Sequence, residues 1–488
     1  MLVSPTREEF LALADRYTIV PVWTDVLGDA VTAVGAHAAL AGEDSSFLLE
    51  SVEGGDRWGR WSFLGWDPLF TLASTDGVVS LTGTQFPIDG SDPLVALESL
   101  LRHCTAPDLA GMPPLHAGVV GYLGYDAVRY IEHLPNRPHD DRGLPEMVWL
   151  GVGSLAAFDK FGQRIRLIRN VLVGSDPAAG YDDAVLRLER AADALGTAPQ
   201  TQVRPVPSFD AIPDSVGSMS KEAYCDAVEQ AIRHIRMGDA YQIVPSVRFE
   251  VEFGGDPFAV YRALRLINPS PFMFYLGLPE MAIAGSSPEL MVRVRDGIVQ
   301  SRPIAGSRRR GSTTVEDVAL EAELLADPKE RAEHVMLVDL ARNDLGRVSR
   351  FGTISVDELM VVERYSHVMH IVSGVSGTLR EDVKPVDVLR ATFPHGTVTG
   401  APKVRAMEII DELEPVARGP YAGAVGYIDF SGNMDTAIGL RTMIAAGGMA
   451  WVQAGAGVVA DSRPASEYEE CRVKAAAVLA AIGAAAHV

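Results

Sequence analysis

The chain of 488 residues carries 43 basic and 64 acidic side chains, so its formal net charge is −21 at pH 7. This length suits roughly two to four domains or one large enzyme unit, and the negative charge argues against a nucleic-acid binder and against adhesion to an anionic membrane. The three cysteines are far apart and form no CxxC pair, which excludes a disulfide framework and a cysteine-based zinc site and fits a reducing cytoplasm: Cys104, Cys225 and Cys471.

The first part of the chain, residues 12–175, mixes short apolar runs with turns and is expected to form an N-terminal region. Alternating and β-branched apolar runs bounded by turn residues are typical of strands. The predicted elements are, in order, strands at 46–51 and 59–68, a strand turning into a helix over 116–135, a strand pair at 147–159 and 162–173, and an amphipathic helix at 182–196.

A segment rich in Pro, Ser and Thr, residues 197–218, has no hydrophobic period and is predicted to be a linker. The second part, residues 219–486, opens with a helix that Ser220 can cap and Gly238 can end. The apolar stripe of this helix has helical spacing: Tyr224, Val228, Ile232 and Ile235.

Beyond this helix, a strand over 240–253 is followed by strands, helices and glycine turns that alternate irregularly. Regular βαβ units would alternate evenly, so a parallel sheet is not expected. The pattern predicts an α+β enzyme with large, mostly antiparallel sheets flanked by helices.

Two predicted helices carry paired carboxylates, and the first covers 327–346. Asp327 suits the N-cap, Pro328 the first turn and Glu330 the third helical position, where a glutamate can complete a capping box. Glu330 and Glu333 lie about 60° apart on the helix surface. Capping explains Glu330, whereas Glu333 is either solvated or functional.

The second carboxylate helix covers 465–482, and Ser466 with Glu469 is expected to form its capping box. Glu467, Glu470 and Lys474 share one face, where an exposed Glu470–Lys474 pair is the simplest interpretation. The two helices could instead meet and hold Mg²⁺, which prefers oxygen ligands. Spacing alone favours the exposed pairs.

Two glycine-rich turns, 394–403 and 452–462, allow a ligand to approach the backbone closely. Thr397 and Thr399 are expected at a helix start, which is either an anion site or simple capping. A third turn, RPIAGSRRRG at 302–311, holds four arginines without neighbouring aromatics, so a nucleic-acid patch is not expected. It is a solvated loop or a source of cations for a small acidic ligand.

Taken together and in order, these segments resemble the chorismate-utilising enzymes and, within that family, the large component of anthranilate synthases. The resemblance runs from about residue 48 to the last helix. It rests on these motifs: GYLGYDAVR, GDAYQIVPS, SSPELMVRV, RPIAGSRRRG, ERAEHVMLVDLARNDLG, RYSHVMHIVSG, PHGTVTGAPKVRAMEIIDELEP, GPYAGAVGY, DTAIGLRTM and QAGAGVVADSRPASEYEE.

The resemblance implies a two-part chorismate-binding fold, chorismate as substrate and Mg²⁺ as cofactor. It implies that Glu333 and Glu470 hold the ion, with Glu330 and Glu467 close by, because a dianionic substrate needs a divalent cation among glutamates. The substrate-binding residues that it implies are Thr397, Tyr421, Arg441, Gly455, Gly457 and Lys474.

Members of this family differ in their nucleophile, and two positions report on it. Isochorismate and salicylate synthases have a water-activating lysine where this chain has Gln242, and aminodeoxychorismate synthases have a covalent lysine where it has Ala305. The resemblance therefore implies direct amination at C2 by ammonia, with those three activities as alternatives. The family commonly has Thr at the position of Ser307, which retains the hydroxyl.

For the chemistry, Glu289 is the candidate general acid for the leaving C4 hydroxyl. His370 is the candidate for assisting the later loss of pyruvate, although a histidine in an apolar strand is often a core residue. The resemblance also implies a tryptophan site, where ordinary core strands are the alternative. Its expected residues are Leu49, Glu50, Ser51, Pro271, Phe272 and Met273.

No cysteine lies in a nucleophile elbow, so ammonia is expected to come from a separate glutamine amidotransferase subunit in a hetero-oligomer. The product, anthranilate, would begin tryptophan biosynthesis, with tryptophan as feedback inhibitor. The N-terminus shows no signal pattern, and no apolar run reaches the ~18 residues of a membrane span. A cytoplasmic protein without nucleic-acid or membrane partners is expected.

Overall fold

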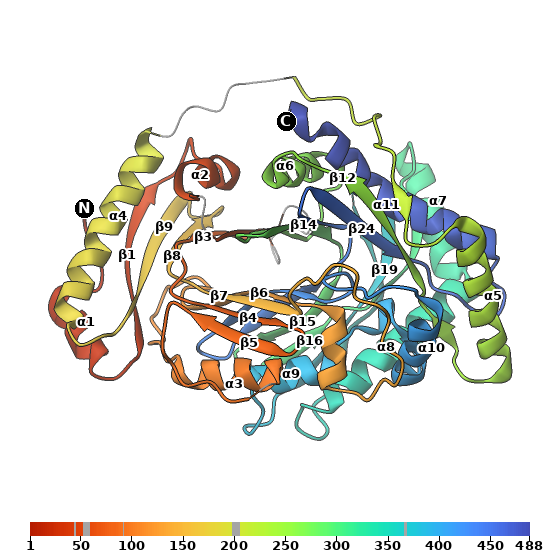
Figure 1. Cartoon of the computed structure of the whole chain (residues 1–488), viewed down its shortest axis with the longest axis horizontal. Coiled ribbons are helices and arrows are strands. Elements are labelled where there is room, and N and C mark those ends of the chain that lie inside the picture. The colour runs from red at the N-terminus through yellow and green to blue at the C-terminus, as the bar shows by residue number, and fades with distance from the viewer. Residues whose placement is uncertain (43–44, 52–58, 91, 198–204, 366–367) are drawn as a thin grey trace.

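The computed structural model describes residues 1–42, 45–51, 59–90, 92–197, 205–365 and 368–488. Two large antiparallel sheets lie one above the other, and helices cover their outer faces (Figure 1). This architecture confirms the α+β class with large antiparallel sheets flanked by helices.

The first sheet has eleven strands and combines both ends of the chain. Its strands are, in spatial order, β1 (Ile19–Leu27), β9 (Arg164–Leu172), β8 (Ser154–Asp159), β3 (Trp61–Trp66), β2 (Ser46–Glu50), β13 (Phe272–Gly277), β14 (Met281–Ser287), β23 (Thr442–Ala446), β24 (Met449–Gly455), β12 (Ser246–Glu252) and β10 (Val216–Gly217).

The second sheet also has eleven strands. They are, in spatial order, β17 (Ile304–Arg309), β19 (Val368–Thr378), β16 (Ile298–Ser301), β15 (Leu290–Arg295), β22 (Met434–Ile438), β21 (Ala424–Asp429), β6 (Gly118–Leu123), β7 (Met147–Gly151), β4 (Thr71–Thr75) and β5 (Val78–Thr82), with β18 (Ser355–Arg364) paired to β19. A separate two-stranded sheet joins β11 (Gln242–Ile243) to β20 (Gly400–Ala401).

Eleven α-helices occur in the described residues: α1 (Arg7–Ala14), α2 (Ala33–Leu40), α3 (Pro93–His103), α4 (Pro177–Thr197), α5 (Lys221–Met237), α6 (Pro257–Ile267), α7 (Thr314–Ala326), α8 (Pro328–Gly346), α9 (Pro385–Thr392), α10 (Lys403–Leu413) and α11 (Pro464–Ala484). Three short 3₁₀ helices are η2 (Tyr125–Tyr130), η3 (Gly396–Val398) and η4 (Ala485–His487). No helix in this part of the chain is long and apolar enough to cross a membrane.

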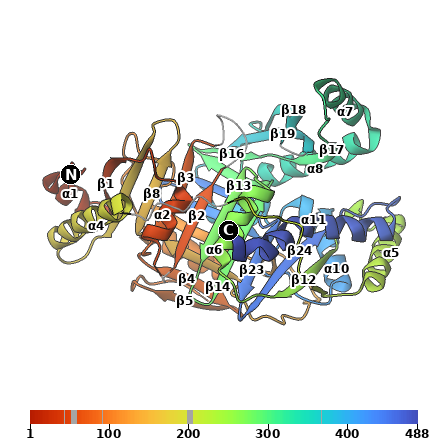
Figure 2. The same ribbon diagram turned by 90° about the horizontal axis from the view of Figure 1, so that it is seen from above.

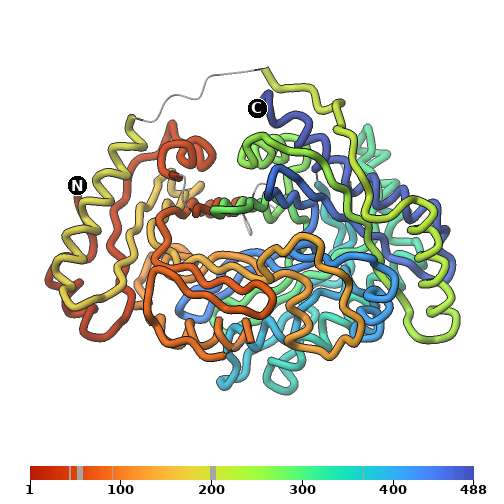
Figure 3. Tube along the Cα trace, viewed as in Figure 1, coloured from red at the N-terminus to blue at the C-terminus, as the bar shows by residue number. Residues whose placement is uncertain are grey.

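Each sheet contains strands from both sequence halves. In the first, β2 pairs with β13 from Met273↔Glu50 to Gly277↔Ser46, and the red and green traces of these strands meet in Figure 3. In the second, β6 pairs with β21. The division at the linker therefore stays a prediction. Within that linker, residues 198–204 lie outside the described part, and Val216–Gly217 form the edge strand β10.

Three apolar layers hold the sheets and helices together. Phe274 and Ile444 of the first sheet pack with Val120 and Tyr427 of the second in one buried cluster between the sheets. A second cluster joins the outer face of the first sheet to its helices, and a third does the same for the second sheet. Burial of this apolar surface is the main driving force for the arrangement.

Most local expectations agree with the structure. Ser220 caps α5, and Gly238 ends it with φ 90°, a left-handed conformation that glycine adopts without strain. The helix expected near 125–135 is the 3₁₀ helix η2 instead. Residues 147–159 form two strands in different sheets, β7 and β8, because the chain crosses between the layers at Val152 and Gly153.

Candidate active site

The candidate catalytic residues come from distant segments that meet where β24 ends, near α8 and α11. Gln242 donates from Nε2 to Oε1 of Glu333 over 3.1 Å. Lys474 of α11 donates to the carbonyl of Gly455 over 2.9 Å, and Arg441 donates to the carbonyl of Lys474 over 2.9 Å. These contacts join β11 to α8, and α11 to the end of β24.

Glu289 lies in the short link between β14 and β15 and is 7% exposed. Burial raises the pKa of its carboxyl to about 7, although the Thr397 hydroxyl and the positive charges of Lys474 and Arg441 oppose this shift. Thr397 lies 3.1 Å from Oε2, whereas Oε1 has no hydrogen-bond partner among the described residues. A buried carboxyl with a pKa near neutrality is suited to general acid catalysis.

Two cations face this acid. Arg441 is half-buried, and this burial lowers its pKa while Tyr421 and the negative charges of Glu470 and Glu289 raise it. Lys474 forms a 2.7 Å ion pair with Glu470, as the i,i+4 spacing on α11 predicted. An arginine and a lysine beside a buried acid can bind an anionic ligand with two carboxylates.

Glycines at 455 and 457 leave room that any other residue would fill. A Cβ atom at Gly455 would lie 2.9 Å from the carbonyl oxygen of Pro245 and 3.0 Å from the hydroxyl of Tyr421. A Cβ at Gly457 would lie 2.7 Å from Nε2 of Gln242. Of the residues predicted from the sequence, Tyr421 therefore lies next to Gly455, and Gln242 lies next to Gly457.

Four glutamates of α8 and α11 influence one another. Burial, followed by the charges of Glu330 and Glu470, raises the pKa of Glu333, while the bond from Gln242 and the charge of Lys329 lower it. Burial and the charge of Glu470 likewise raise the pKa of Glu467. The two carboxylate helices therefore face each other, which spacing alone did not establish.

These carboxylates fit Mg²⁺ by donor chemistry, because a divalent cation takes oxygen ligands and would relieve their mutual repulsion. In the described ranges, no three histidine, cysteine, aspartate or glutamate side chains are grouped closely enough to hold a metal as they stand. Gln242 and Lys474 instead partner Glu333 and Glu470.

The N-termini of these helices are only partly as predicted. Asp327 caps α8 by accepting from the backbone N–H groups of Lys329 and Glu330 at 2.9 and 3.3 Å. The side chain of Glu330 contacts Arg308 at 3.3 Å rather than completing a capping box. The predicted Ser466 capping box is wrong: α11 begins at Pro464, which places Ser466 inside the first turn.

The helix start expected at Thr397 and Thr399 is also wrong. These residues lie in and just after the short η3, and α10 begins only at Lys403. Thr399 donates its hydroxyl to the carbonyl of His395 over 3.1 Å, so it does not serve an anion. Thr397 reaches Glu289 instead.

The arginine-rich segment is neither a loop in solvent nor a nucleic-acid patch. It forms β17, and Figure 2 shows α7, α8 and β17–β19 together at one corner of the molecule. Arg308 pairs with Glu323 and Asp327 at 2.9 Å each, and Arg310 pairs with Asp317 at 2.9 Å. Arg309 and Arg302 also pair with glutamates. Arg308, Arg309 and Arg310 thus hold α7 and the start of α8 against β17, whereas Arg302 pairs with Glu363 of β18.

Ala305 of β17 stands opposite Ile371 of β19, and His370 is adjacent in that strand. Nδ1 of His370 lies 2.9 Å from the Ser307 hydroxyl and 3.3 Å from the carbonyl of Gly306. Burial and, more weakly, the charge of Arg441 lower the pKa of His370 while the Gly306 carbonyl raises it. A neutral imidazole of this kind can accept a proton.

A cavity of about 530 Å³ opens between the two sheets, away from these residues. All six residues of the expected tryptophan site line it: Leu49, Glu50, Ser51, Pro271, Phe272 and Met273. Trp61 and Tyr427 supply aromatic surface, while Arg293 and Asp435 supply charge. The cavity thus offers apolar walls and both signs of charge, which suits a zwitterionic aromatic ligand.

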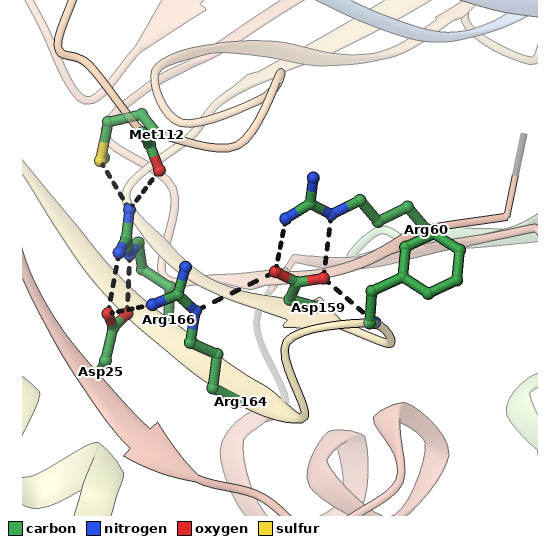
Figure 4. A network of polar contacts seen from close by, with 8 residues as sticks. Asp25, Arg60, Met112, Asp159, Arg164 and Arg166 are labelled. Atoms are coloured by element: carbon green, nitrogen blue, oxygen red, sulfur yellow. Dashed lines mark hydrogen bonds and ion pairs between the residues drawn. The ribbon is translucent and has the colours of Figure 1, made fainter. Parts of the chain in front are cut away.

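A charged network stiffens one wall of this cavity (Figure 4). Arg60 donates two hydrogen bonds of 3.0 and 2.8 Å to the carboxylate of Asp159, and its guanidinium lies over the ring of Trp61. Arg166 grips Asp25 in the same bidentate way, at 2.7 and 2.8 Å, and also contacts Met112. Bidentate pairs fix geometry as well as charge, so Arg60 and Met112 present a defined surface to the cavity.

Two functional candidates were missed from the sequence. Arg418 and Glu414 form a fully buried ion pair of 2.6 Å beside the site. Nδ1 of His395 lies 2.9 Å from the hydroxyl oxygen of Thr397, which also contacts Glu289. Glu414 and Arg418 are four residues apart, a spacing that indicates an ion pair within a helix. Pro415 lies between them and argues against such a helix, so the pair was not predicted.

Comparison with known proteins identifies the family of the chain. A family model described as chorismate binding enzyme matches residues 46–480. Anthranilate synthase component 1 of Acetivibrio thermocellus is 47% identical over 485 residues, covering 98% of each chain, and that of Mycolicibacterium smegmatis is 48% identical over 495 residues, covering 99% of this chain and 94% of the relative.

Among solved structures, anthranilate synthase component I from Streptococcus pneumoniae superposes with a TM-score of 0.78 at 35% identity, covering 93% of this chain and 99% of that one. The menaquinone-specific isochorismate synthase of Escherichia coli shares the fold, with a TM-score of 0.71 at 20% identity, 98% of each chain being covered. The chain therefore belongs to the chorismate-binding enzyme family and, within it, to the anthranilate synthase component I proteins.

Proposed function

We propose that this chain converts chorismate and ammonia to anthranilate and pyruvate in an Mg²⁺-dependent reaction, the first committed step of tryptophan biosynthesis. The observation that carries the proposal is the buried acid Glu289, which faces Arg441 and Lys474 and keeps one carboxyl oxygen without a partner in the described residues. Gln242 and Ala305 offer no competing nucleophile or strong base.

Substrate binding follows from charge. Chorismate carries two carboxylates, and Arg441 and Lys474 are the cations that would neutralise them. The metal would be held by Glu333 and Glu470, with Glu330 and Glu467 close by. When bound, Mg²⁺ supplies positive charge against the ring carboxylate.

In the first step, ammonia forms a bond to C2, the ring double bond shifts and the C4–O bond breaks. Glu289 gives its proton to the departing hydroxyl, which leaves as water, and the ammonium group formed at C2 loses one proton to become the amine. A general acid contributes most when its pKa lies near the working pH, and the pKa of about 7 supports this role.

In the second step, the C2 proton is removed and the C3–O bond to the side chain breaks. The side chain leaves as the enolate of pyruvate, which takes up one proton at its methylene carbon to give pyruvate, and the ring becomes aromatic. His370 is the residue we assign to accept the C2 proton, and its lowered pKa supports a neutral, proton-accepting imidazole.

Ammonia would come from a separate glutamine amidotransferase subunit, which makes the working enzyme a hetero-oligomer. The cysteines of this chain are unsuited to hydrolysing glutamine: burial raises the pKa of both Cys104 and Cys471 to about 12, and such thiols are poor nucleophiles. Three free cysteines support a reducing, cytoplasmic setting.

A second role, feedback inhibition by tryptophan, is favoured by the cavity between the sheets. The wall strand β15 begins directly after Glu289 and carries Arg293 to the cavity, and β13, the other wall strand, pairs with β14, which ends at Ser287. A ligand in the cavity would thus contact β15, which follows the acid, and β13, the partner of the strand that precedes it. It would inhibit by favouring one position of Glu289 over another.

The reaction is tested by incubating the pure chain with chorismate, Mg²⁺ and an ammonium salt and separating the products. Fluorescent anthranilate and an equal amount of pyruvate are expected. Isochorismate, salicylate or a product aminated at C4, without anthranilate, would overturn the proposal and identify which alternative activity the chain has.

A further inference from the structure

A buried histidine with no role in the proposed mechanism lies directly behind the acid. His395 is 6% exposed, and its Nδ1 lies 2.9 Å from the hydroxyl oxygen of Thr397. That hydroxyl in turn lies 3.1 Å from Oε2 of Glu289. The three side chains form one continuous chain of two hydrogen bonds.

Thr397 has a single hydroxyl proton but stands between two possible acceptors. If Glu289 is ionised, the hydroxyl donates to Oε2 and is turned away from His395. If Glu289 is protonated, it donates to the Thr397 oxygen, and the hydroxyl proton is free to bond Nδ1. The direction of the whole chain therefore depends on the protonation of Glu289.

The surroundings of His395 make Nδ1 an acceptor. The backbone N–H of Thr397 also points at Nδ1, at 3.4 Å, which requires a lone pair on that nitrogen. Burial and then the nearby charge of Lys403 lower the pKa of His395 to about 3, so the ring is neutral at working pH. Lys403 is itself held by Asp344 at 2.8 Å.

We propose that His395 is a positioning residue that favours the protonated form of Glu289. As an acceptor it completes the hydrogen-bond chain only when Glu289 carries its proton, whereas ionised Glu289 leaves two lone pairs facing each other at 2.9 Å. His395 thereby keeps Glu289 protonated, so that it can donate its proton to the departing hydroxyl. Lys474 and Arg441, the charged groups that face Glu289, act in the opposite sense. The catalytic part of this inference rests on the proposed function.

The test compares two replacements of His395 over a range of pH. His395→Leu keeps apolar volume but removes the acceptor, while His395→Asn retains an acceptor oxygen at the same position along the side chain. For the parent, kcat/KM should fall above about pH 7, the pKa of Glu289. His395→Leu removes one hydrogen bond that stabilises the protonated form of Glu289. The alkaline limb of the profile, where kcat/KM falls with rising pH, should therefore move to lower pH by about half to one unit. At alkaline pH that is a roughly three- to tenfold lower kcat/KM, with little change at acidic pH.

His395→Asn should keep the limb near its parental position. An unmoved limb in His395→Leu, a limb moved upward, or equal shifts in both variants would overturn the inference, because loss of packing alone does not distinguish an acceptor from its absence. His395→Phe repeats the comparison if the leucine variant fails to fold.

A second readout does not need activity. The infrared carbonyl band of protonated Glu289, identified by its loss in Glu289→Gln, should titrate at lower pH in His395→Leu than in the parent or His395→Asn. If no variant or parent forms anthranilate but this band behaves as expected, the proposed function fails and the inference about His395 stands. If anthranilate forms and the band does not move, only the inference fails.

Discussion

Replacing Arg418 with methionine should lower the free energy of unfolding by about 3–5 kcal/mol, because it leaves the charge of Glu414 buried without its cation, with only the hydrogen bonds from Ser246 remaining. Both side chains are almost inaccessible, at 2% and 5% exposure. Nε and Nη2 of Arg418 donate to the two carboxylate oxygens of Glu414 over 2.8 and 2.6 Å. Few side-chain pairs in the described structure are as completely enclosed.

The loss extends to the site. Arg418 also donates to the carbonyls of Val398 and Val244 at 2.8 and 2.7 Å, and each buried carbonyl left unpaired costs roughly 1–3 kcal/mol. Val398 follows Thr397, and Val244 lies two residues after Gln242. The variant should therefore lose activity at urea concentrations where it remains folded.

Urea unfolding followed by tryptophan fluorescence measures the change. The matched control is Arg472→Met, which removes a pair with Glu469 whose side chains are 60% and 58% exposed, and which should change stability by under about 0.5 kcal/mol. The double variant Arg418→Met/Glu414→Gln should be more stable than Arg418→Met, because no buried charge remains. A loss below about 1 kcal/mol in the single variant, or a double variant that is less stable still, would refute this reasoning.

Three further outcomes follow from the site and the cavity. Gly457→Ala should lower kcat/KM by roughly tenfold or more, because its Cβ would lie 2.7 Å from Nε2 of Gln242; Gly254→Ala, with nothing within 4 Å, is the control and should match the parent. Glu333→Gln should abolish Mg²⁺-dependent turnover while leaving the circular dichroism spectrum intact, and full activity at saturating Mg²⁺ would contradict the metal assignment. Tryptophan should bind the cavity in a calorimetric titration, and Met273→Ala should weaken it by roughly tenfold; unchanged affinity would place the effector elsewhere.

Local features of the fold could be predicted because nearby residues decide them. Ser220 caps the start of α5 and Gly238 terminates it, each through contacts within its own turn, and Asp327 caps the start of α8 in the same way. The pairing of β2 with β13 had no such signal, since it joins strands separated by most of the N-terminal region and the linker. Both strands are apolar, and the sequence contains many apolar strands.

The site was predicted by residue type and motif order, and the errors arose where a partner came from elsewhere in the chain. Glu330 has the spacing of a capping residue, but the cation of Arg308 binds it instead. The error at Ser466 is local instead: α11 begins at Pro464, two residues before the cap that the spacing of Ser466 and Glu469 suggested. His395 was passed over because its significance depends on the position of Glu289, which is distant in sequence and only 3.1 Å from their shared neighbour, Thr397.

The most direct test of the proposed chemistry follows the atoms. Chorismate is incubated with the chain, Mg²⁺ and ¹⁵N-ammonium in ¹⁸O-water, and the isotope content of the products is measured by mass spectrometry. Direct amination predicts anthranilate that carries one ¹⁵N and no ¹⁸O, with Glu289→Gln forming far less of it. An aromatic or isomerised product that contains ¹⁸O at the ring, or ¹⁵N at C4, would contradict the account.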